Sequence, residues 1–339
     1  MWSSTSRAAL LALALAACAH DDPWAPGYYG PNGPLDGGSP GRLTLSTGVD
    51  AEPAWLPRDT ALLYATEPGD RADGDRCLGV FSAVRWTEER ALCRPAAIAD
   101  DSVDFFDWPA ASADGQVAYL WTVSVVGAQF PTRRSLVVGP LRPFQGGERV
   151  VAVYPSSRGS GGGVVTDGAT HLGWIDATDL VFVRAVLTIT FDRLTNSWDS
   201  TEAGIDIERL DPTAAAPVAV PVAGTSGATS VATDGGRAIY YTLSGDPSVY
   251  RQQIDSGAVT VAHTFGGAPP TDVAVRGSRL VAVAGGVVHV VDLGSGGDAP
   301  FSAPGVSFSH PALSGGGRVV VVDGISPGSR PDLWRITLP

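Results

Sequence analysis

The sequence predicts an all-β fold, and two observations support this prediction. First, the chain combines 44% hydrophobic with 17% charged residues and contains 42 glycines and 26 prolines. Such a chain is too apolar to stay disordered, and its frequent turn formers leave little room for long helices. Second, the strand–turn–strand pattern of residues 42–65 recurs in degraded form along the chain. We therefore expect one domain of strands and turns.

The recurring unit has three parts, and six copies of it are visible. An apolar or proline-containing strand is followed by a polar turn with Asp or Gly, and then by a strand of branched and aromatic residues. Each copy is followed by enough residues for a further hairpin, so that a full unit would have four strands. Four-stranded units at spacings of roughly 40 to 60 residues are typical of β-propeller blades. The sequence predicts six blades, with seven as the alternative because residues 156–163 and 185–221 are poorly patterned. The copies lie at residues 54–64, 109–119, 171–183, 230–241, 272–283 and 311–322.

The two ends of the repeat region are predicted to close the ring. Residues Arg42–Leu45 precede the first repeat, and the alternating segment Asp332–Leu338 ends the chain. A closed ring removes the exposed outermost edges that an open array of sheets would leave. We expect the N-terminal segment to pair with the last strand and to complete the last blade.

The N-terminus resembles a bacterial lipoprotein signal peptide over residues 1–17. One positive charge precedes an apolar run of residues 8–17, which is shorter than the roughly 20 residues that a membrane-spanning helix needs. Leu15-Ala-Ala-Cys18 resembles a lipobox, which implies that Cys18 becomes a lipid-bearing N-terminus. An ordinary cleaved signal is the alternative.

The lipoprotein resemblance also implies a location and a domain plan. Ala19 stands where the family places an inner-membrane retention Asp, which favours the outer membrane, with the domain facing the periplasm or the cell surface. Residues 18–41 are rich in Pro and Gly and are predicted to form a tether. The propeller is predicted to occupy residues 42–339.

The other two cysteines, Cys77 and Cys93, are predicted to form a disulfide. They lie on two expected strands around a polar turn, and an exported protein can keep such a pair oxidised. The alternative, a redox-active or metal-binding pair, has neither CxxC spacing nor nearby histidines in its favour.

The charge balance excludes some partners. Arginine supplies all 23 basic residues, against 35 acidic ones, and the formal net charge is −12. This balance argues against nucleic acid, because binding to nucleic acid depends on neutralising phosphates. It also argues against a basic membrane-binding surface. We therefore expect membrane contact through the lipid on Cys18 only.

The first two copies resemble the propeller repeats of the TolB-like family, which are related in architecture to WD repeats. The family pattern begins Pro-x-Trp-Ser-Pro-Asp-Gly. Residues 53–59 read Pro-Ala-Trp-Leu-Pro-Arg-Asp, and residues 109–115 read Pro-Ala-Ala-Ser-Ala-Asp-Gly. Later copies keep only the outline. The resemblance implies a propeller over most of residues 42–339 and would allow a partner's terminus to bind in the channel.

The start of the innermost strand of each blade is the candidate site, because these positions surround the central channel of a propeller. One carboxylate and two imidazoles among them are a plausible ligand set for a divalent transition metal. Oligogalacturonate lyases share this broad repeat type and use a metal bound in the channel. The alternative is a polar channel lining with no metal and no other cofactor. The aligned residues are Glu52, Trp108, His171, Ala228, Thr271 and His310.

No catalytic residue is predicted. Residues 324–328 fit the letters of a nucleophile elbow around Ser326. No helix is expected after it, however, and Pro327 lacks the backbone N–H that would help to form an oxyanion hole.

The sequence favours an envelope lipoprotein that acts as a propeller-type protein-binding or scaffolding module for an envelope protein or peptide. The alternative is a carbohydrate-active enzyme, a lyase or hydrolase, with a divalent metal in the channel; breakdown of a peptide is a variant of it. A metal-binding cluster would favour the enzyme. An open apolar rim around Trp55, Trp108 and Trp174 would favour a protein or peptide partner.

Overall fold

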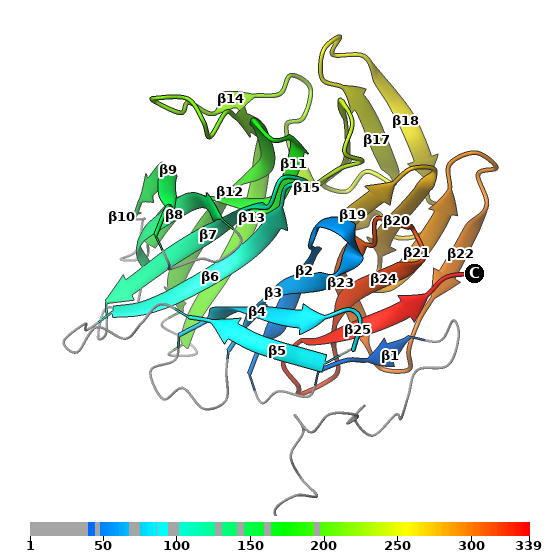
Figure 1. Cartoon of the computed structure of the whole chain (residues 1–339), viewed down its shortest axis with the longest axis horizontal. Coiled ribbons are helices and arrows are strands. Elements are labelled where there is room, and N and C mark those ends of the chain that lie inside the picture. The colour runs from blue at the N-terminus through cyan, green and yellow to red at the C-terminus, as the bar shows by residue number, and fades with distance from the viewer. Residues whose placement is uncertain are drawn as a thin grey trace, which may run out of the picture.

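In the computed structural model, six antiparallel sheets are arranged around a common axis (Figure 1). This confirms a six-bladed β-propeller. The predicted signal peptide, Cys18 and almost all of the predicted tether lie outside the described residues. Within the described part of the chain, no helix is long and apolar enough to cross a membrane. The structure describes residues 40–44, 48–67, 75–85, 87–93, 102–125, 131–140, 146–158, 164–192 and 197–339.

The blades follow one another along the chain. Blade 1 contains β2 (Asp50–Trp55), β3 (Ala61–Thr66), β4 (Cys77–Ser82) and β5 (Thr87–Leu92). Blade 2 contains β6 (Ser102–Ala111), β7 (Gln116–Val125), β8 (Pro131–Pro140) and β9 (Arg149–Pro155). Blade 3 contains β10 (Ser157–Arg158), β11 (Val164–Asp176), β12 (Asp179–Asp192), β13 (Ser197–Leu210) and β14 (Val220–Pro221).

Blade 4 contains β15 (Ala228–Thr233), β16 (Ala238–Leu243), β17 (Ser248–Gln253) and β18 (Val259–Thr264). Blade 5 contains β19 (Pro270–Arg276), β20 (Arg279–Ala284), β21 (Val287–Asp292) and β22 (Asp298–Phe301). Blade 6 contains β23 (Ser307–Leu313), β24 (Val319–Ile325), β25 (Asp332–Thr337) and, at its outer edge, β1 (Gly41–Arg42).

The hydrophobic core lies between neighbouring blades. Leu63 and Val80 of blade 1 pack in one cluster with Phe106 and Tyr119 of blade 2, and equivalent clusters join the other neighbours. A strand in the middle of a blade is thus covered on both faces. This explains why all six residues of β3 are apolar or small and buried, instead of alternating with polar ones.

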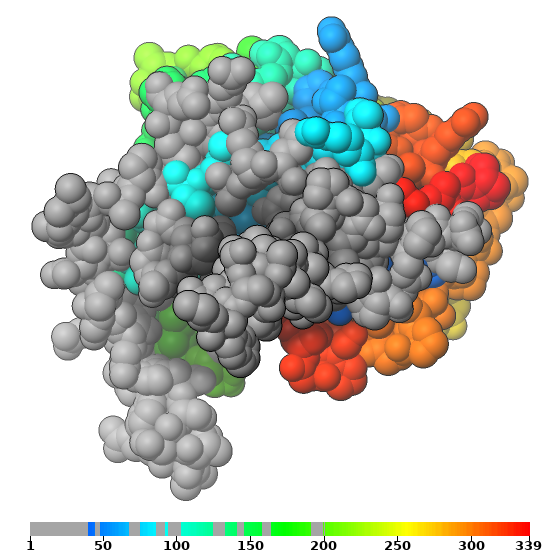
Figure 2. Space-filling view, turned by 60° about the horizontal axis from the view of Figure 1, so that its bottom comes forward, coloured from blue at the N-terminus to red at the C-terminus, as the bar shows by residue number. Residues whose placement is uncertain are grey.

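The ring closes as predicted, through the N-terminal strand. Gly41 pairs with Arg335 and Arg42 with Trp334, so that β1 lies antiparallel to β25. The ladder is shorter than the predicted Arg42–Leu45, because Thr44 contributes its side chain instead: its Oγ1 accepts the Leu333 N–H at 2.9 Å. Figure 2 shows the blue residues of blade 1 beside the orange and red residues of blade 6.

Cys77 and Cys93 form the disulfide that the sequence predicts. It joins the start of β4 to the residue after β5, with a Cα–Cα distance of 4.7 Å. Closing a loop of this length stabilises the fold by about 3 kcal/mol in the chain-entropy model. The bond therefore reinforces the outer hairpin of blade 1.

The described parts of the two poorly patterned regions belong to blade 3, and the described strands form six sheets and no seventh. β11, β12 and β13 are 13 or 14 residues long, about twice the length of the strands of blades 4 to 6. Residues 186–189 and 204–206, in the extended parts of β12 and β13, are only half-buried. Their sequence pattern is weak because neither face of the extension is fully covered.

Candidate metal centre at the channel mouth

Four innermost strands hold a non-glycine residue in the left-handed backbone region at the aligned position. The φ angles are 56° at Glu52, 55° at Trp108, 51° at His171 and 45° at His310. A β-bulge interrupts the pairing at each of them. A bulge inserts one extra residue and redirects side chains, and such strained conformations concentrate at functional sites.

Three of these residues precede a proline, namely Pro53, Pro109 and Pro311. A hydrogen bond of the strand ladder is lost at a bulge, so a backbone N–H there would have no partner within the sheet. Proline has no N–H to leave unsatisfied. The X-Pro pairs therefore suit the bulge and help to explain why it recurs.

Blades 4 and 5 differ from this pattern. The blade 4 bulge lies between Ala228 and Ser230. Ala228, which the comparison of the repeats places at the bulge, therefore lies one residue before it. In blade 5 the bulge falls between Pro270 and Asp272, and the hydroxyl of Thr271 donates to Asp272 Oδ2 at 2.7 Å. Thr271 does not line the pocket at the channel mouth, whereas Asp272 does.

That pocket has a volume of about 170 Å³ and is lined by all six innermost strands. Glu52, Trp108, His171 and His310 are among its lining residues. The strands therefore bring four of the predicted channel residues together, and they add the carboxylate of Asp272.

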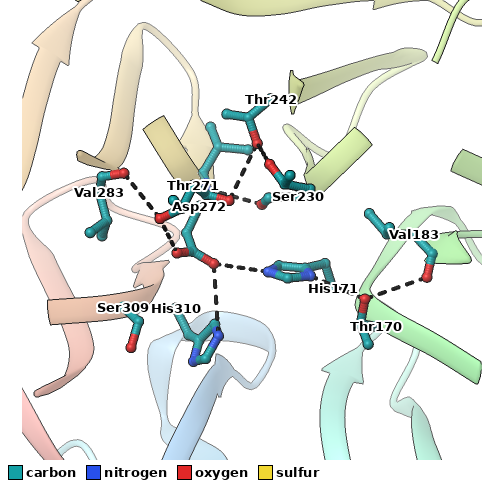
Figure 3. A network of polar contacts seen from close by, with 12 residues as sticks. Thr170, His171, Val183, Ser230, Thr242, Thr271, Asp272, Val283, Ser309 and His310 are labelled. Atoms are coloured by element: carbon teal, nitrogen blue, oxygen red, sulfur yellow. Dashed lines mark hydrogen bonds and ion pairs between the residues drawn. The ribbon is translucent and has the colours of Figure 1, made fainter. Parts of the chain in front are cut away.

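Two imidazoles face one oxygen of Asp272. His171 Nε2 lies 2.9 Å from Asp272 Oδ1, and His310 Nε2 lies 3.8 Å from the same atom (Figure 3). One ligand atom from each of the three residues lies within 4.8 Å of the other two. Two imidazole nitrogens and a carboxylate oxygen are common ligands of zinc and of other divalent transition metals.

The other ring nitrogens are held by protein oxygens. His171 Nδ1 lies 3.3 Å from Thr170 Oγ1, and His310 Nδ1 lies 2.9 Å from Asp323 Oδ2. Asp323 is itself held, because the Ser309 hydroxyl donates to its Oδ2 at 3.0 Å. Metal-binding histidines usually have Nδ1 or Nε2 fixed in this way by a second oxygen, which orients the free nitrogen. The residues therefore fit a metal ion.

The protonation states follow from burial and from these contacts. Burial lowers the pKa of His310, but the carboxylates of Asp323 and Asp272 outweigh it and raise this pKa to about 10. Burial raises the pKa of Asp272, but His310 and His171 outweigh it and bring this pKa to about 2. Burial lowers the pKa of His171. Without a metal, the cluster therefore contains a charged His310 between two carboxylates.

Glu52, the predicted carboxylate ligand, makes a different contact. Its Oε2 accepts the backbone N–H of Trp108 at 2.5 Å. Burial and the nearby carboxylate of Asp107 raise the pKa of Glu52 to about 8. Glu52 is therefore mostly protonated at neutral pH and places an acidic proton in the pocket.

The Glu52→Gln variant tests this protonation. The pKa of Glu52 is higher in the folded state than its ordinary value of 4.5, so folded protein holds the proton more tightly. The stabilisation is complete below about pH 4.5 and is lost as the pH rises through about 8. We expect the variant to gain stability over the wild type as the pH rises from 5 to about 8, measured by urea unfolding. An equal stability difference at all pH values would show that Glu52 is ionised.

Trp55, Trp108 and Trp174 all line the pocket, and each of them also contacts a neighbouring blade. The Trp55 indole N–H donates to Ala312 O at 3.1 Å, and that of Trp174 donates to Ala110 O at 3.2 Å. Both bonds join neighbouring blades. The ring of Trp108 lies 4.2 Å from that of His171 and 4.7 Å from that of His310 between centroids, so it packs on the cluster.

Sequence alignment missed three members of the site: Asp272, Thr170 and Asp323. A signal was present for Asp272, because it directly follows the aligned Thr271 and begins the fifth copy of the repeat. Ser326 lies in the turn after β24, outside the pocket lining.

Comparisons with known proteins agree with the fold. The chain is similar to regucalcin, a calcium-binding protein from Agrobacterium tumefaciens, with a TM-score of 0.55 and 12% identity over 88% of this chain and 92% of that one. It is also similar to an oligogalacturonate lyase in complex with manganese, with a TM-score of 0.51 and 14% identity over 88% and 93%. TolB from Acinetobacter baumannii gives a TM-score of 0.51 and 16% identity over 82% of this chain and 64% of that one.

These likenesses confirm the β-propeller fold, and TolB is among the proteins that share it. No family model and no curated protein matches the sequence. Since one propeller fold carries many functions, the function has to be argued from the site.

Proposed function

We propose that the protein is a metal-dependent propeller enzyme. His171, Asp272 and His310 bind one divalent transition metal ion at the channel mouth. The observation that carries this proposal is the convergence of both Nε2 atoms on Asp272 Oδ1, while oxygens of Thr170 and Asp323 hold both Nδ1 atoms. Two of the similar structures are described as binding manganese or calcium, which supports a metal in a propeller of this type.

Three protein ligands leave coordination positions for an oxygen-rich ligand, as in catalytic zinc sites. When bound, the metal polarises a ligand oxygen. The pocket also contains Glu52, whose raised pKa makes it a proton donor at neutral pH. A metal site beside a neutral carboxylic acid suits a lyase or hydrolase acting on a polysaccharide.

A protein-binding or scaffolding module is the second candidate. The pocket lining supports it, because it includes apolar residues such as Pro53, Leu172 and Pro311, which offer contacts to a peptide. The chain would then bind an envelope protein or peptide without turnover.

We also propose, from the lipobox-like sequence before Cys18, that the protein is exported and anchored by lipid, in the outer membrane.

Metal content tests the first proposal. A protein that begins at Ala19, purified without chelators, should contain about one equivalent of a transition metal, measured by elemental mass spectrometry. It should also take up Mn²⁺ or Zn²⁺ in titration calorimetry. A His171→Ala, His310→Ala double variant should lose both, because two of the three ligands are gone.

His289→Ala is the matched control. His289 lies on β21 and pairs with Asp298 at 2.9 Å, outside the pocket lining, so this variant should keep the metal. Absence of metal uptake by the wild type, or equal uptake by the double variant, would contradict the proposal. The metal-loaded protein is then incubated with acidic polysaccharides. The lyase is favoured if the wild type forms an unsaturated product and the Glu52→Gln variant does not. Binding without turnover would favour the module.

A further inference from the structure

The two carboxylate oxygens of Asp272 have different surroundings. Oδ1 faces the Nε2 atoms of His171 and His310, whereas Oδ2 accepts the hydroxyl of Thr271 at 2.7 Å (Figure 3). The same hydroxyl lies 3.4 Å from Val283 O, but it has only one proton to donate. The shorter distance and the charged acceptor favour the bond to the carboxylate. Thr271 therefore holds Oδ2, and Oδ1 is left directed at the two imidazoles.

The bulge of blade 5 makes this contact possible. Thr271 is the extra residue between the paired residues Pro270 and Asp272 of β19. In a regular strand, the side chains of two consecutive residues point to opposite faces of the sheet. A bulge redirects side chains, and here it brings the hydroxyl onto the carboxylate of the next residue.

Blade 4 holds the backbone on both sides of Asp272. The Val273 N–H donates to Ser230 Oγ at 3.0 Å, and the Thr242 hydroxyl donates to Thr271 O at 3.4 Å. Ser230 and Thr242 are fully buried, so these donors and acceptors have little freedom to move. Blade 4 thus supplies none of the three candidate ligands, but it fixes the segment that carries one of them.

We propose that Thr271 is a positioning residue of the metal centre, which keeps Asp272 a ligand through one oxygen, Oδ1. The inference rests on the metal site proposed above. Thr271 completes a set of outer partners, because Thr170 and Asp323 already hold the second nitrogens of the two histidines. Outer partners of this kind typically change metal affinity by about 10- to 100-fold when they are removed.

Occupation of Oδ2 suits the number of ligands in the site. Two imidazole nitrogens and one carboxylate oxygen make three protein ligands, which leaves a fourth position open, as in catalytic zinc sites. A carboxylate that binds through both oxygens is instead typical of calcium sites. The Thr271 hydroxyl therefore favours a transition metal with an open position.

The Thr271→Val variant tests the proposal in the protein that begins at Ala19. Valine keeps the branched shape but lacks the hydroxyl. We expect Zn²⁺ and Mn²⁺ to bind at least tenfold more weakly in titration calorimetry, still with about one ion per chain. Thr271 is exposed, so the variant should fold normally, which circular dichroism and melting without metal check.

Two further variants separate positioning from a general effect on the strand. Thr271→Ser keeps the hydroxyl and should bind metal nearly as tightly as the wild type. Thr264→Val is the matched control, because Thr264 is exposed on β18 and its hydroxyl lies 3.2 Å from Ser248 Oγ, outside the pocket lining. This control should leave the affinity unchanged.

Thermal melting in the presence of metal provides a second readout. Stabilisation by a ligand grows with the ratio of its concentration to the dissociation constant, so Zn²⁺ should raise the melting temperature of Thr271→Val less than that of the wild type. Wild-type affinity in Thr271→Val, or an equal loss in Thr271→Val and Thr271→Ser, would overturn the inference while the metal site stands. A wild type that binds no metal would contradict the metal site itself, and the inference with it.

Discussion

A chain that begins at Gly48 should be less stable than one that begins at Gly38, because it lacks the strand that closes the ring. The shorter chain loses the pairing of β1 with β25 and the bonds of Leu43 and Thr44 to Leu333. It also loses the Arg42–Asp332 ion pair. Each hydrogen bond contributes about 1 kcal/mol, and Leu43 adds apolar burial. We expect a total loss of about 3 to 5 kcal/mol and a melting temperature lower by roughly 10 °C.

Calorimetry and light scattering of the two chains provide the measurement. The shorter chain should also aggregate earlier on heating, because the outer edge of β25 becomes a template for other strands. A chain with the Thr44→Val substitution should lie between the two, since it loses only the bonds of the Thr44 hydroxyl to the Leu333 N–H and to Asp332. If both truncated chains melt together, the N-terminal strand does not hold the ring closed.

Metal binding should release about one proton at pH 7. Asp323 and Asp272 raise the pKa of His310 to about 10, so this imidazole is charged below that pH and must lose its proton to bind a metal. His171, with its lowered pKa, is already neutral and releases none. The apparent affinity should therefore rise about tenfold for each pH unit between 6.5 and 8. Titration calorimetry in buffers of different ionisation enthalpy measures the released protons directly.

The Asp323→Asn variant separates this account from a general pH effect. Asp323 contributes more than any other group to raising the pKa of His310, so its removal should lower that pKa. Proton release at pH 7 should fall, and the dependence of affinity on pH should flatten. A wild type that releases no proton on binding metal at pH 7 would show that His310 is not a ligand.

Sequence reasoning located the inner strands but not the detail of the site. The first copies of the repeat contain Pro53-Ala-Trp55 and Pro109, which anchor the alignment to the residues before them, Glu52 and Trp108. Both line the pocket. In blade 4 the alignment placed Ala228, one residue before the bulged Thr229. In blade 5 it placed the bulged Thr271, but the pocket residue is the next one, Asp272. The carboxylate was missed because blade 5 presents the residue after its bulge to the pocket, and the repeat pattern does not encode this difference.

The sequence by itself determined the repeat number, the closing strand and the Cys77–Cys93 pair, because each depends on local patterns of strand and turn residues. Tertiary structure decided which groups meet in the channel. His171, Asp272 and His310 come from blades 3, 5 and 6, and Asp323 reaches His310 from the neighbouring strand β24. Such contacts depend on the register of each bulge and on the packing of six separate sheets around one axis, which no local pattern encodes.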